Sequence, residues 1–310
     1  MKCFHKNWIT SYYGNQGNQV KNNDTFTVEY TCARNTRVNL YNEAIRSVYH
    51  IRDDFPNEKY GLLFSGGIES EIMLRSFQES NIPFQVFIGR YERDINLYDV
   101  SFAVTICESR NIPYTIIDFD LAKFLQNDAL EIARTATCSE ARLLPQLALA
   151  DKLDIMPIMA NGEAAPRRLD RDYEKPSTWV LDEDENFWSW PRYFTIQNRP
   201  AVPEYCRYTS EMYNTWFNLR WFKLLTTDKI YGKTAAWSSK IDGYREQYAD
   251  LITRRKLTGF ETVEHLFNDL NHYLEALLPD QITHTYTVDG FFEHKLHAIT
   301  ETSTKLYRKQ

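Results

Sequence analysis

The chain has 310 residues, of which 43% are hydrophobic and 25% charged, and its formal net charge is −6 at pH 7. This length and composition are typical of a globular protein with one large α/β domain or two smaller ones. The negative charge argues against nucleic-acid binding over a broad surface, although a local basic groove stays compatible with it. No apolar run approaches the roughly 20 residues of a membrane span, and the first residues lead into no signal-peptide core. We therefore expect a cytoplasmic protein with no membrane partner.

The five cysteines are too far apart in the sequence for a C-x-x-C pair. Zinc ribbons and iron–sulfur sites need such pairs, so the spacing argues against both. We interpret the cysteines as lone buried thiols. They are Cys3, Cys32, Cys107, Cys138 and Cys206.

Residues 1–39 are polar and rich in asparagine. Apolar and polar residues alternate over residues 25–30, which predicts one strand there. We interpret 1–39 as a short β preface to the main domain. Residues 40–55 then carry apolar residues at helical spacing, with Asn39 as the expected N-cap of that helix.

The central stretch of the sequence is residues 60–77. An apolar run over 60–64 predicts a buried strand, which stops at Ser65-Gly66-Gly67, and helical spacing with acidic residues in the first turn follows. Two successive glycines in such a turn allow positive φ and leave several N–H groups pointing at one spot, which attracts anions. The stretch therefore predicts a phosphate-binding loop, and the alternative is a tight βα turn without a ligand.

Buried strands and helices alternate through the next hundred residues. The strands are predicted at 83–88, 112–118 and 155–160. Helical patterns cover 96–110 and 121–153, and the second of them is broken near 135–139. The strand at 83–88 is expected to end at Gly89, and Ser139 is the expected N-cap of the helix that runs to Leu153. Strands that alternate with covering helices predict an α/β fold with a doubly wound parallel sheet.

Beyond residue 170 this alternation is lost. Four successive acidic residues, 182–185, fit a cation site but also a solvated loop. The aromatic helical face over 208–225 favours core packing or a subunit interface, which is compatible with a homo-oligomer. We expect a mainly helical C-terminal region over 171–310, which follows an α/β domain over 40–170.

The six residues from Ser65 to Ser70, SGGIES, resemble the SGGxDS signature of the PP-loop ATP pyrophosphatases. Within that superfamily the chain resembles most the synthetase domain of asparagine synthetase, in the order of its elements over residues 40–170. Glu69 stands where the family has Asp, so the carboxylate is kept with one more methylene. The resemblance implies a HUP/PP-loop fold, ATP and Mg²⁺ as cofactors, and Glu69 as a metal ligand. The phosphate-binding residues that it implies are Ser65, Gly66, Gly67, Ile68, Glu69 and Ser70.

Two further sets of residues match the family by their order along the chain. Backbone at the end of the second strand holds adenine in the family, which implies that role for Phe87, Ile88 and Gly89, although they fit a plain core and turn as well. A late lysine in the family reaches the ATP phosphates. Lys256 is the best match for it and Arg255 the second, and the alternative is a basic helix end followed by a glycine cap.

The stretch after the fourth strand resembles the family's second motif, Gly-Glu-Gly-x-Asp-Glu. Gly162 and Glu163 match its beginning, and the resemblance implies nucleotide binding by Gly162 and a catalytic role for Glu163. Pro166 and Arg167 replace the Asp-Glu of the motif. We therefore expect recognition of the acceptor to differ from that of the family.

The resemblance implies an AMP- and pyrophosphate-forming ligase that adenylates a carboxylate or amide-like oxygen of a small molecule or modified base for attack by ammonia. Residues 1–39 are too few for a glutaminase domain, so the ammonia is expected to be free or to come from a glutaminase on another chain. Two alternatives stay open. One is a sulfurtransferase acting on an RNA nucleobase, with Cys138 and Cys206 as its candidate pair. The other is a nucleotide-binding or scaffold protein without catalysis.

Overall fold

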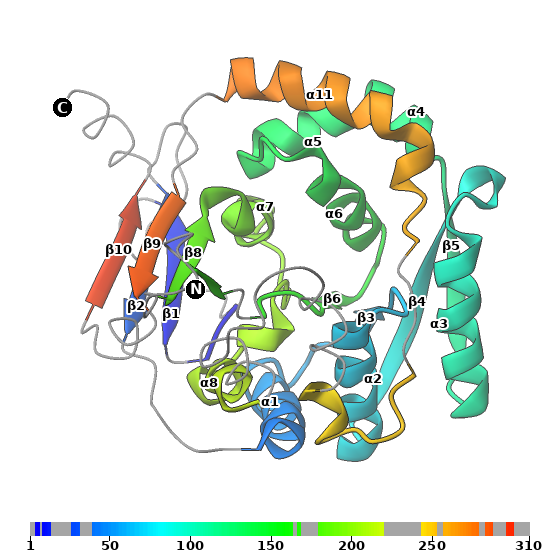
Figure 1. Ribbon diagram of the computed structural model, residues 1–310, viewed down its shortest axis with the longest axis vertical. Coiled ribbons are helices and arrows are strands. Elements are labelled where there is room, and N and C mark those ends of the chain that lie inside the picture. Colours follow the sequence, from blue (N-terminus) through cyan, green and yellow to red (C-terminus); the bar gives the residue numbers. More distant parts are fainter. Residues whose placement is uncertain are drawn as a thin grey trace, which may run out of the picture.

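The protein is described from a computed structural model over residues 4–6, 8–13, 26–31, 39–163, 166–168, 179–219, 243–252, 257–278, 283–287 and 296–300. A four-stranded parallel sheet, in the order β5-β4-β3-β6, extends from the middle of the molecule to its right-hand side in the view of Figure 1. Its strands are β3 (Tyr60–Leu63), β4 (Phe84–Tyr91), β5 (Tyr114–Phe119) and β6 (Met156–Met159). The chain runs outward from β3 to β5 and returns to pair β6 with the other side of β3. The predicted doubly wound parallel sheet is therefore confirmed.

Helices precede and connect these strands. They are α1 (Leu40–Asp54) before β3, α2 (Ile68–Ser80) after it, α3 (Leu97–Ser109) before β5, and α4 (Leu121–Asn127), α5 (Ala129–Ala136) and α6 (Leu144–Asp151) between β5 and β6. The 3-10 helices η1 (Glu92–Asp94) and η2 (Ala141–Leu143) precede α3 and α6. The predicted N-cap of α1 is confirmed, because the Asn39 side chain accepts a hydrogen bond from the Asn42 N–H.

The sheet divides the hydrophobic core into two clusters, because successive side chains of a strand point to opposite faces. Leu62, Val86 and Ile158 pack in the cluster that also holds the buried faces of α1, α2 and α3. Leu63 and Met159, one position further along their strands, belong to the cluster with α4, α5 and α6. Both faces of the sheet are thus covered by helices, which explains why its strands read as continuous apolar runs.

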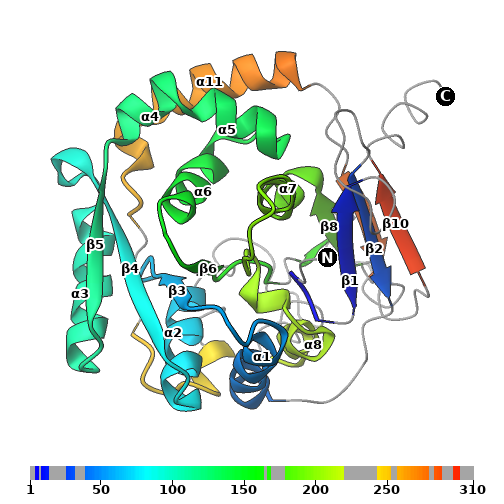
Figure 2. The same ribbon diagram turned by 180° about the vertical axis from the view of Figure 1, so that it is seen from behind.

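Two antiparallel sheets lie together at the side of the molecule away from α3 and β5 (Figure 2). One consists of β1 (Ile9–Tyr13), β2 (Phe26–Thr31) and β10 (Leu296–Thr300), and the other of β7 (Pro166–Arg168), β8 (Trp179–Asp184) and β9 (Thr283–Thr287). The predicted strand at 25–30 is confirmed as β2. The acidic run at 182–185 lies in β8 and the start of η3, so it is not a loop.

Helices complete the later part of the chain. They are η3 (Glu185–Trp188), α7 (Ser189–Ile196), η4 (Tyr205–Arg207), α8 (Ser210–Asn218), η5 (Phe260–Val263) and α11 (Glu264–Leu277). In both views α11 lies along α4 and α5 (Figures 1 and 2), where Phe267 and Leu274 enter the cluster that those helices form. The predicted helical face at 208–225 is described only up to residue 219.

Two predicted boundaries are wrong. β4 continues past Gly89 to Tyr91, because it stays paired with β5 as far as Phe119. Ser139 caps no helix, since its N–H and hydroxyl donate to Asn186 Oδ1 at 2.8 and 3.3 Å, and α6 begins only at Leu144. A tertiary acceptor has taken the place of the expected cap.

We expect Leu62→Ala to lower the free energy of unfolding by about 2–5 kcal/mol, because the side chain is 0% exposed in the middle of the sheet and its removal leaves a cavity. Urea denaturation measures the loss. Leu97→Ala is the matched control, since Leu97 is 50% exposed, and it should change the stability by no more than about 0.5 kcal/mol. Similar losses in the two variants would contradict the arrangement of the core.

Candidate functional site

A pocket opens at the carboxyl ends of β3, β4 and β6. The chain changes its winding direction between β3 and β6, and open α/β sheets bind ligands at such a point. The cavity volume of about 140 Å³ is roughly ten times what one water molecule needs, so a small molecule fits. Among the residues that line it are Ser65, Gly67, Glu69, Ser70, Phe87, Ile88, Gly89, Tyr91, Asn96, Asp99, Gln146, Asn161, Thr258 and Phe260.

The turn between β3 and α2 is folded around the side chain of Ser65. Its hydroxyl oxygen accepts from the Gly67 N–H at 3.3 Å and lies 3.2 Å from the Ser70 hydroxyl, which in turn donates to the Gly67 carbonyl at 2.8 Å. Gly66 has a φ of +72°, and a Cβ at this position would lie 3.0 Å from the backbone nitrogen of Ala103 on α3. Only glycine adopts this φ without strain and, having no Cβ, lets the turn pack so closely against the backbone of α3.

The first turn of α2 begins at this turn of the chain. Its N-cap is Gly67, which has no side chain to cap the helix, and among the backbone N–H groups of the described residues the Ser65 hydroxyl accepts only from that of Gly67. The helix therefore presents N–H groups and the positive end of its dipole beside the pocket, an arrangement that an anion satisfies. The side chain of Ile68 packs against the core, so this residue offers only its backbone, whereas Ser65, Gly67, Glu69 and Ser70 line the cavity.

Three acidic and phenolic groups meet beside the start of α2. The hydroxyl of Tyr244 lies 3.2 Å from Glu163 Oε2 and 3.4 Å from Glu69 Oε1, and its one proton can be donated to either carboxylate. Burial, together with the negative charges of Glu163 and Glu69, raises the pKa of Tyr244 well above its ordinary value, so the phenol stays protonated at neutral pH. The structure thus brings the two carboxylates that were predicted from separate motifs to one hydroxyl.

Tyr244 is a site residue that sequence reasoning missed. It is 0% exposed, and its ring packs edge-on against Trp216 with the ring centroids 5.2 Å apart. It lies 175 positions from Glu69 and 81 from Glu163. No spacing rule joins residues so far apart, and the chain holds 20 tyrosines, so the sequence carried no signal for this one.

The end of β4 forms another wall of the pocket, which includes the predicted Phe87, Ile88 and Gly89. The Phe87 carbonyl accepts from the Phe64 N–H at 2.9 Å, which aligns β4 with the chain entering the Ser65 turn. Asn96 donates to the Gly89 carbonyl at 3.0 Å and accepts from the Tyr91 N–H at 2.8 Å. The ring of Tyr91 also stacks on that of Phe260, with the centroids 5.9 Å apart. The end of β4 is therefore fixed both by the Asn96 hydrogen bonds and by this ring contact.

The segment from Leu257 to Phe260 lies at the rim of the pocket. The Leu257 N–H donates to Asp99 Oδ1 at 2.8 Å, and Thr258 and Phe260 line the cavity. Lys256 and Arg255, the predicted cations, lie outside the described residues. Their roles stay predictions. Leu257, the residue after Lys256, is hydrogen-bonded to Asp99 at the rim of the pocket.

The turn that carries Glu163 is supported by buried charges. Gly162 has a φ of +85°, and its carbonyl accepts from Arg207 Nε at 3.2 Å, while a Cβ at Gly162 would lie 2.5 Å from Arg207 Cγ. Arg207 Nε lies 3.8 Å from Glu204 Oε1, and His5 Nε2 lies 2.7 Å from Glu204 Oε2. Burial by itself would raise the pKa of Glu204, but Arg207 and His5 outweigh it and hold that pKa below its ordinary value.

The described residues contain no larger cluster of metal-binding side chains. No group of three or more His, Cys, Asp or Glu side chains there could hold a metal ion. Cys107, Cys138 and Cys206 are buried free thiols, and burial raises the pKa of both Cys107 and Cys138 to about 11. Within the same described residues, no helix has the length and apolar character needed to cross a membrane.

No protein-family model matches the chain, and no curated protein matches it. Solved structures that show a partial likeness to the chain include three synthetases. The NH3-dependent NAD synthetase from Campylobacter jejuni has a TM-score of 0.29 and 15% identity, over 40% of this chain and 58% of that one. The NMN synthetase from Francisella tularensis has a TM-score of 0.32 and 12% identity, over 75% of this chain and 93% of that one. The NAD+ synthetase from Burkholderia pseudomallei has a TM-score of 0.27 and 14% identity, over 78% of this chain and 91% of that one.

The first of these likenesses spans less than two thirds of the length of the Campylobacter protein. All three TM-scores lie below 0.5 and all identities below 25%. We therefore draw no conclusion about activity from them. The function of this chain has to be inferred from the geometry of its own residues.

We expect Gly66→Ala to lower the free energy of unfolding by about 1–3 kcal/mol, because alanine resists the positive φ and its Cβ presses on the backbone of α3. Gly67→Ala is the matched control. Gly67 has a φ of −69°, which alanine adopts readily, and the nearest neighbour of its Cβ is Ser65 Oγ at 3.2 Å. Urea denaturation compares the two variants, and equal losses would refute the role assigned to Gly66.

Glu204→Gln should cost about 3 kcal/mol of stability at pH 7, because it removes the charge that pairs with Arg207 in a buried place. A carboxylate whose pKa is lowered by folding contributes fully above its ordinary pKa of 4.5, and the contribution is lost as the pH falls through the folded value. The stability difference from the native protein should therefore shrink in urea titrations below about pH 4.5. Glu275→Gln, at an exposed position of α11, is the control, and a difference independent of pH would contradict the assignment.

Proposed function

We propose that this protein is an ATP-dependent ligase that forms AMP and pyrophosphate. It adenylates a carboxylate or amide-like oxygen of an acceptor, and ammonia then displaces AMP to form a carbon–nitrogen bond. The observation that carries the proposal is the uncapped, glycine-bearing start of α2, which faces a pocket beside two carboxylates at the switch point of a parallel sheet. Such a site suits a phosphate chain together with its metal ion.

The Ser65 turn supports binding of the phosphates. The N–H groups of the first turn of α2 lie beside the cavity, and the hydroxyls of Ser65 and Ser70 line it. The Ser70 proton is donated to the Gly67 carbonyl, so this hydroxyl has to rotate before it can donate to a phosphate. Donors that are already oriented lose little entropy when an anion binds, and hydrogen bonds to charged groups are the stronger kind. The backbone of Phe87, Ile88 and Gly89, on the facing strand, is the proposed adenine site.

Glu69 and Glu163 fit a divalent cation. Mg²⁺ is usually held by one or two carboxylates together with substrate phosphates and water. A divalent cation between these carboxylates and a triphosphate would attract both. When bound, Mg²⁺ supplies charge neutralisation on the phosphate oxygens.

The proposed reaction has two steps. An acceptor oxygen attacks the α-phosphorus of ATP, and the bond between that phosphorus and the bridging oxygen breaks to release pyrophosphate. Ammonia then attacks the activated carbon, AMP leaves with the acceptor oxygen, and one proton passes to the solvent. The residues of the chain act mainly by positioning and by electrostatic stabilisation, a role that we propose for Glu163, Lys256 and Arg255.

No observation favours the sulfurtransferase alternative. Cys138 and Cys206 are fully buried, they belong to different core clusters, and neither lines the pocket. A catalytic thiol has to reach its thiolate form, and burial raises the pKa of Cys138. A nucleotide-binding protein without catalysis would share the same pocket, and only a measurement of product formation separates it from the ligase.

We expect the native protein to bind ATP with Mg²⁺, and Ser65→Ala/Gly67→Ala to weaken this binding at least about tenfold, since a hydroxyl donor is lost and a methyl group enters the phosphate site. Isothermal titration calorimetry measures both affinities. Ser109→Ala, on the exposed end of α3, is the control and should bind as the native protein does.

Pyrophosphate release from ATP in the presence of ammonia and candidate carboxylate or amide acceptors then tests the ligase. Absence of ATP binding by the native protein, or equal binding by the double variant, would overturn the proposed site. Binding without pyrophosphate release for any acceptor would favour the non-catalytic alternative.

A further inference from the structure

We propose that Tyr244 is a positioning residue that holds the carboxylates of Glu69 and Glu163 in place for one divalent cation. This inference rests on the function proposed above for the pocket. It adds the hydroxyl of Tyr244, which lies outside both motifs, as a group on which binding of the metal depends. Three observations carry it: the place of the hydroxyl, the burial of the ring and the docking of its segment.

The first observation is the place of the hydroxyl. Its oxygen is within 3.4 Å of one carboxylate oxygen of Glu69 and one of Glu163. Glu69 is carried by α2 and Glu163 by the turn after β6, so no local structure sets the distance between them. Two carboxylates repel each other, and a phenol that donates to either one offsets part of this repulsion.

The second observation is that Tyr244 cannot easily move away. Its side chain is 0% exposed and packs edge-on against Trp216, which is itself 1% exposed. A buried aromatic ring with such a neighbour keeps a single rotamer. The hydroxyl therefore has a defined position before any ligand binds, as a group that orients metal ligands must have.

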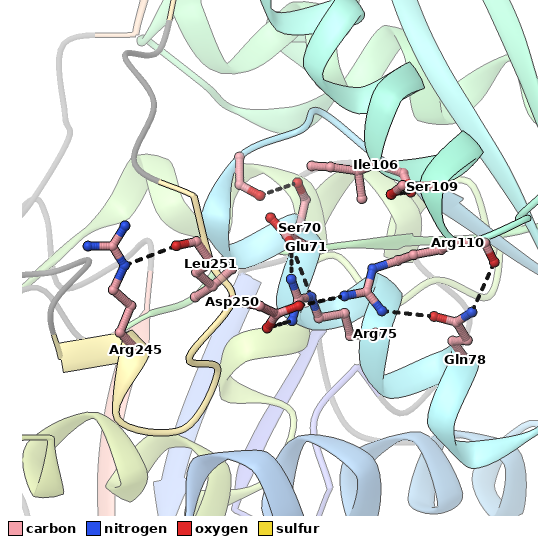
Figure 3. A network of polar contacts seen from close by, with 11 residues as sticks. Ser70, Glu71, Arg75, Gln78, Ile106, Ser109, Arg110, Arg245, Asp250 and Leu251 are labelled. Carbon is pink, nitrogen blue, oxygen red and sulfur yellow. Dashed lines mark hydrogen bonds and ion pairs between the residues drawn. The ribbon is translucent and has the colours of Figure 1, made fainter.

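The third observation is the docking of residues 243–252, the segment that carries Tyr244 (Figure 3). Asp250 Oδ1 lies 2.5 Å from Arg75 Nη1, and Asp250 Oδ2 lies 3.3 Å from Arg110 Nη2. Arg75 is 8% exposed and also donates from Nε to Glu71 Oε1 at 2.9 Å. Arg75 and Glu69 both belong to α2. This helix therefore supplies one of the two carboxylates and also anchors the segment that carries Tyr244.

A rival interpretation is that the hydroxyl occupies the place of the cation and has to leave before the cation binds. The two interpretations predict opposite effects of Tyr244→Phe. Loss of a positioning donor weakens metal binding, typically by about 10- to 100-fold for groups that hydrogen-bond to metal ligands. Loss of an obstructing hydroxyl tightens it.

The test uses Mn²⁺ as the probe, because its electron paramagnetic resonance signal reports the free ion. The native protein, Tyr244→Phe and Tyr248→Phe are titrated with Mn²⁺ alone and with Mn²⁺ and ATP, and a protein-free titration of ATP corrects for the Mn²⁺ that ATP itself binds. Tyr248 is the matched control, since it is a buried tyrosine of the same segment, packed against Tyr41 and Arg75 rather than at the carboxylates. ATP binding in the presence of EDTA is measured for each variant by calorimetry.

We expect Tyr244→Phe to weaken Mn²⁺ binding by about 10- to 100-fold and to leave metal-free ATP binding within about twofold of the native value. Tyr248→Phe should leave both unchanged. Asp250→Ala, which releases the segment without touching the pocket, should weaken Mn²⁺ binding in the same direction but less. Thermal denaturation of each variant verifies that the protein stays folded.

The outcomes separate this inference from the function on which it rests. A native protein that binds no Mn²⁺ with ATP would overturn both. Native binding with equal binding by Tyr244→Phe would overturn only the role of Tyr244, and tighter binding would establish the rival interpretation. Equal weakening by Tyr244→Phe and Tyr248→Phe would show a general structural effect and would also overturn the inference.

Discussion

The positive end of the α2 dipole is the feature on which the rest of the site depends. Gly66 adopts a positive φ against the backbone of α3, and this turn directs the start of α2 toward the pocket. The N-cap residue, Gly67, has no side chain with which to cap the first turn. Glu69 lines the same pocket, and Glu163 meets Glu69 at the Tyr244 hydroxyl. Negative charges at these positions oppose the binding of an anion that the helix attracts. A nucleotide bound together with a divalent cation satisfies both demands at once, and this is the physical basis of the ligase that we propose.

Two buried arginines hold the parts of the chain that carry these carboxylates and their donor. Arg207 binds the carbonyl of Gly162 and is balanced by Glu204, whereas Arg75 is balanced by Glu71 and Asp250. A buried charge is costly unless it is paired, so each loop has one arrangement of low free energy. Such pairs contribute more to the position of the site than to the net stability of the fold, because much of their attraction offsets the cost of desolvation.

The failures of prediction share a physical cause. Ser139 has the side chain of an N-cap, yet its donors are satisfied by Asn186 from another part of the fold. Strand β4 passes Gly89 because its pairing with β5 outweighs the local tendency of glycine to end a strand. Cys138 and Cys206 were candidates for a reactive pair only as long as their burial in separate clusters was unknown. In each case a contact distant in sequence overrode a local preference.

From the sequence alone, the strand, the two glycines and the helix after them were predictable, as was the alternation of strands and helices that defines the parallel sheet. Those features depend on neighbours within a few residues, whose spacing the sequence displays directly. Only the tertiary structure decided that Glu69 and Glu163 meet at one hydroxyl, and that this hydroxyl belongs to Tyr244. The strand order of the sheet and the ion pair of Asp250 with Arg75 bring these residues together, and no local pattern records either of them.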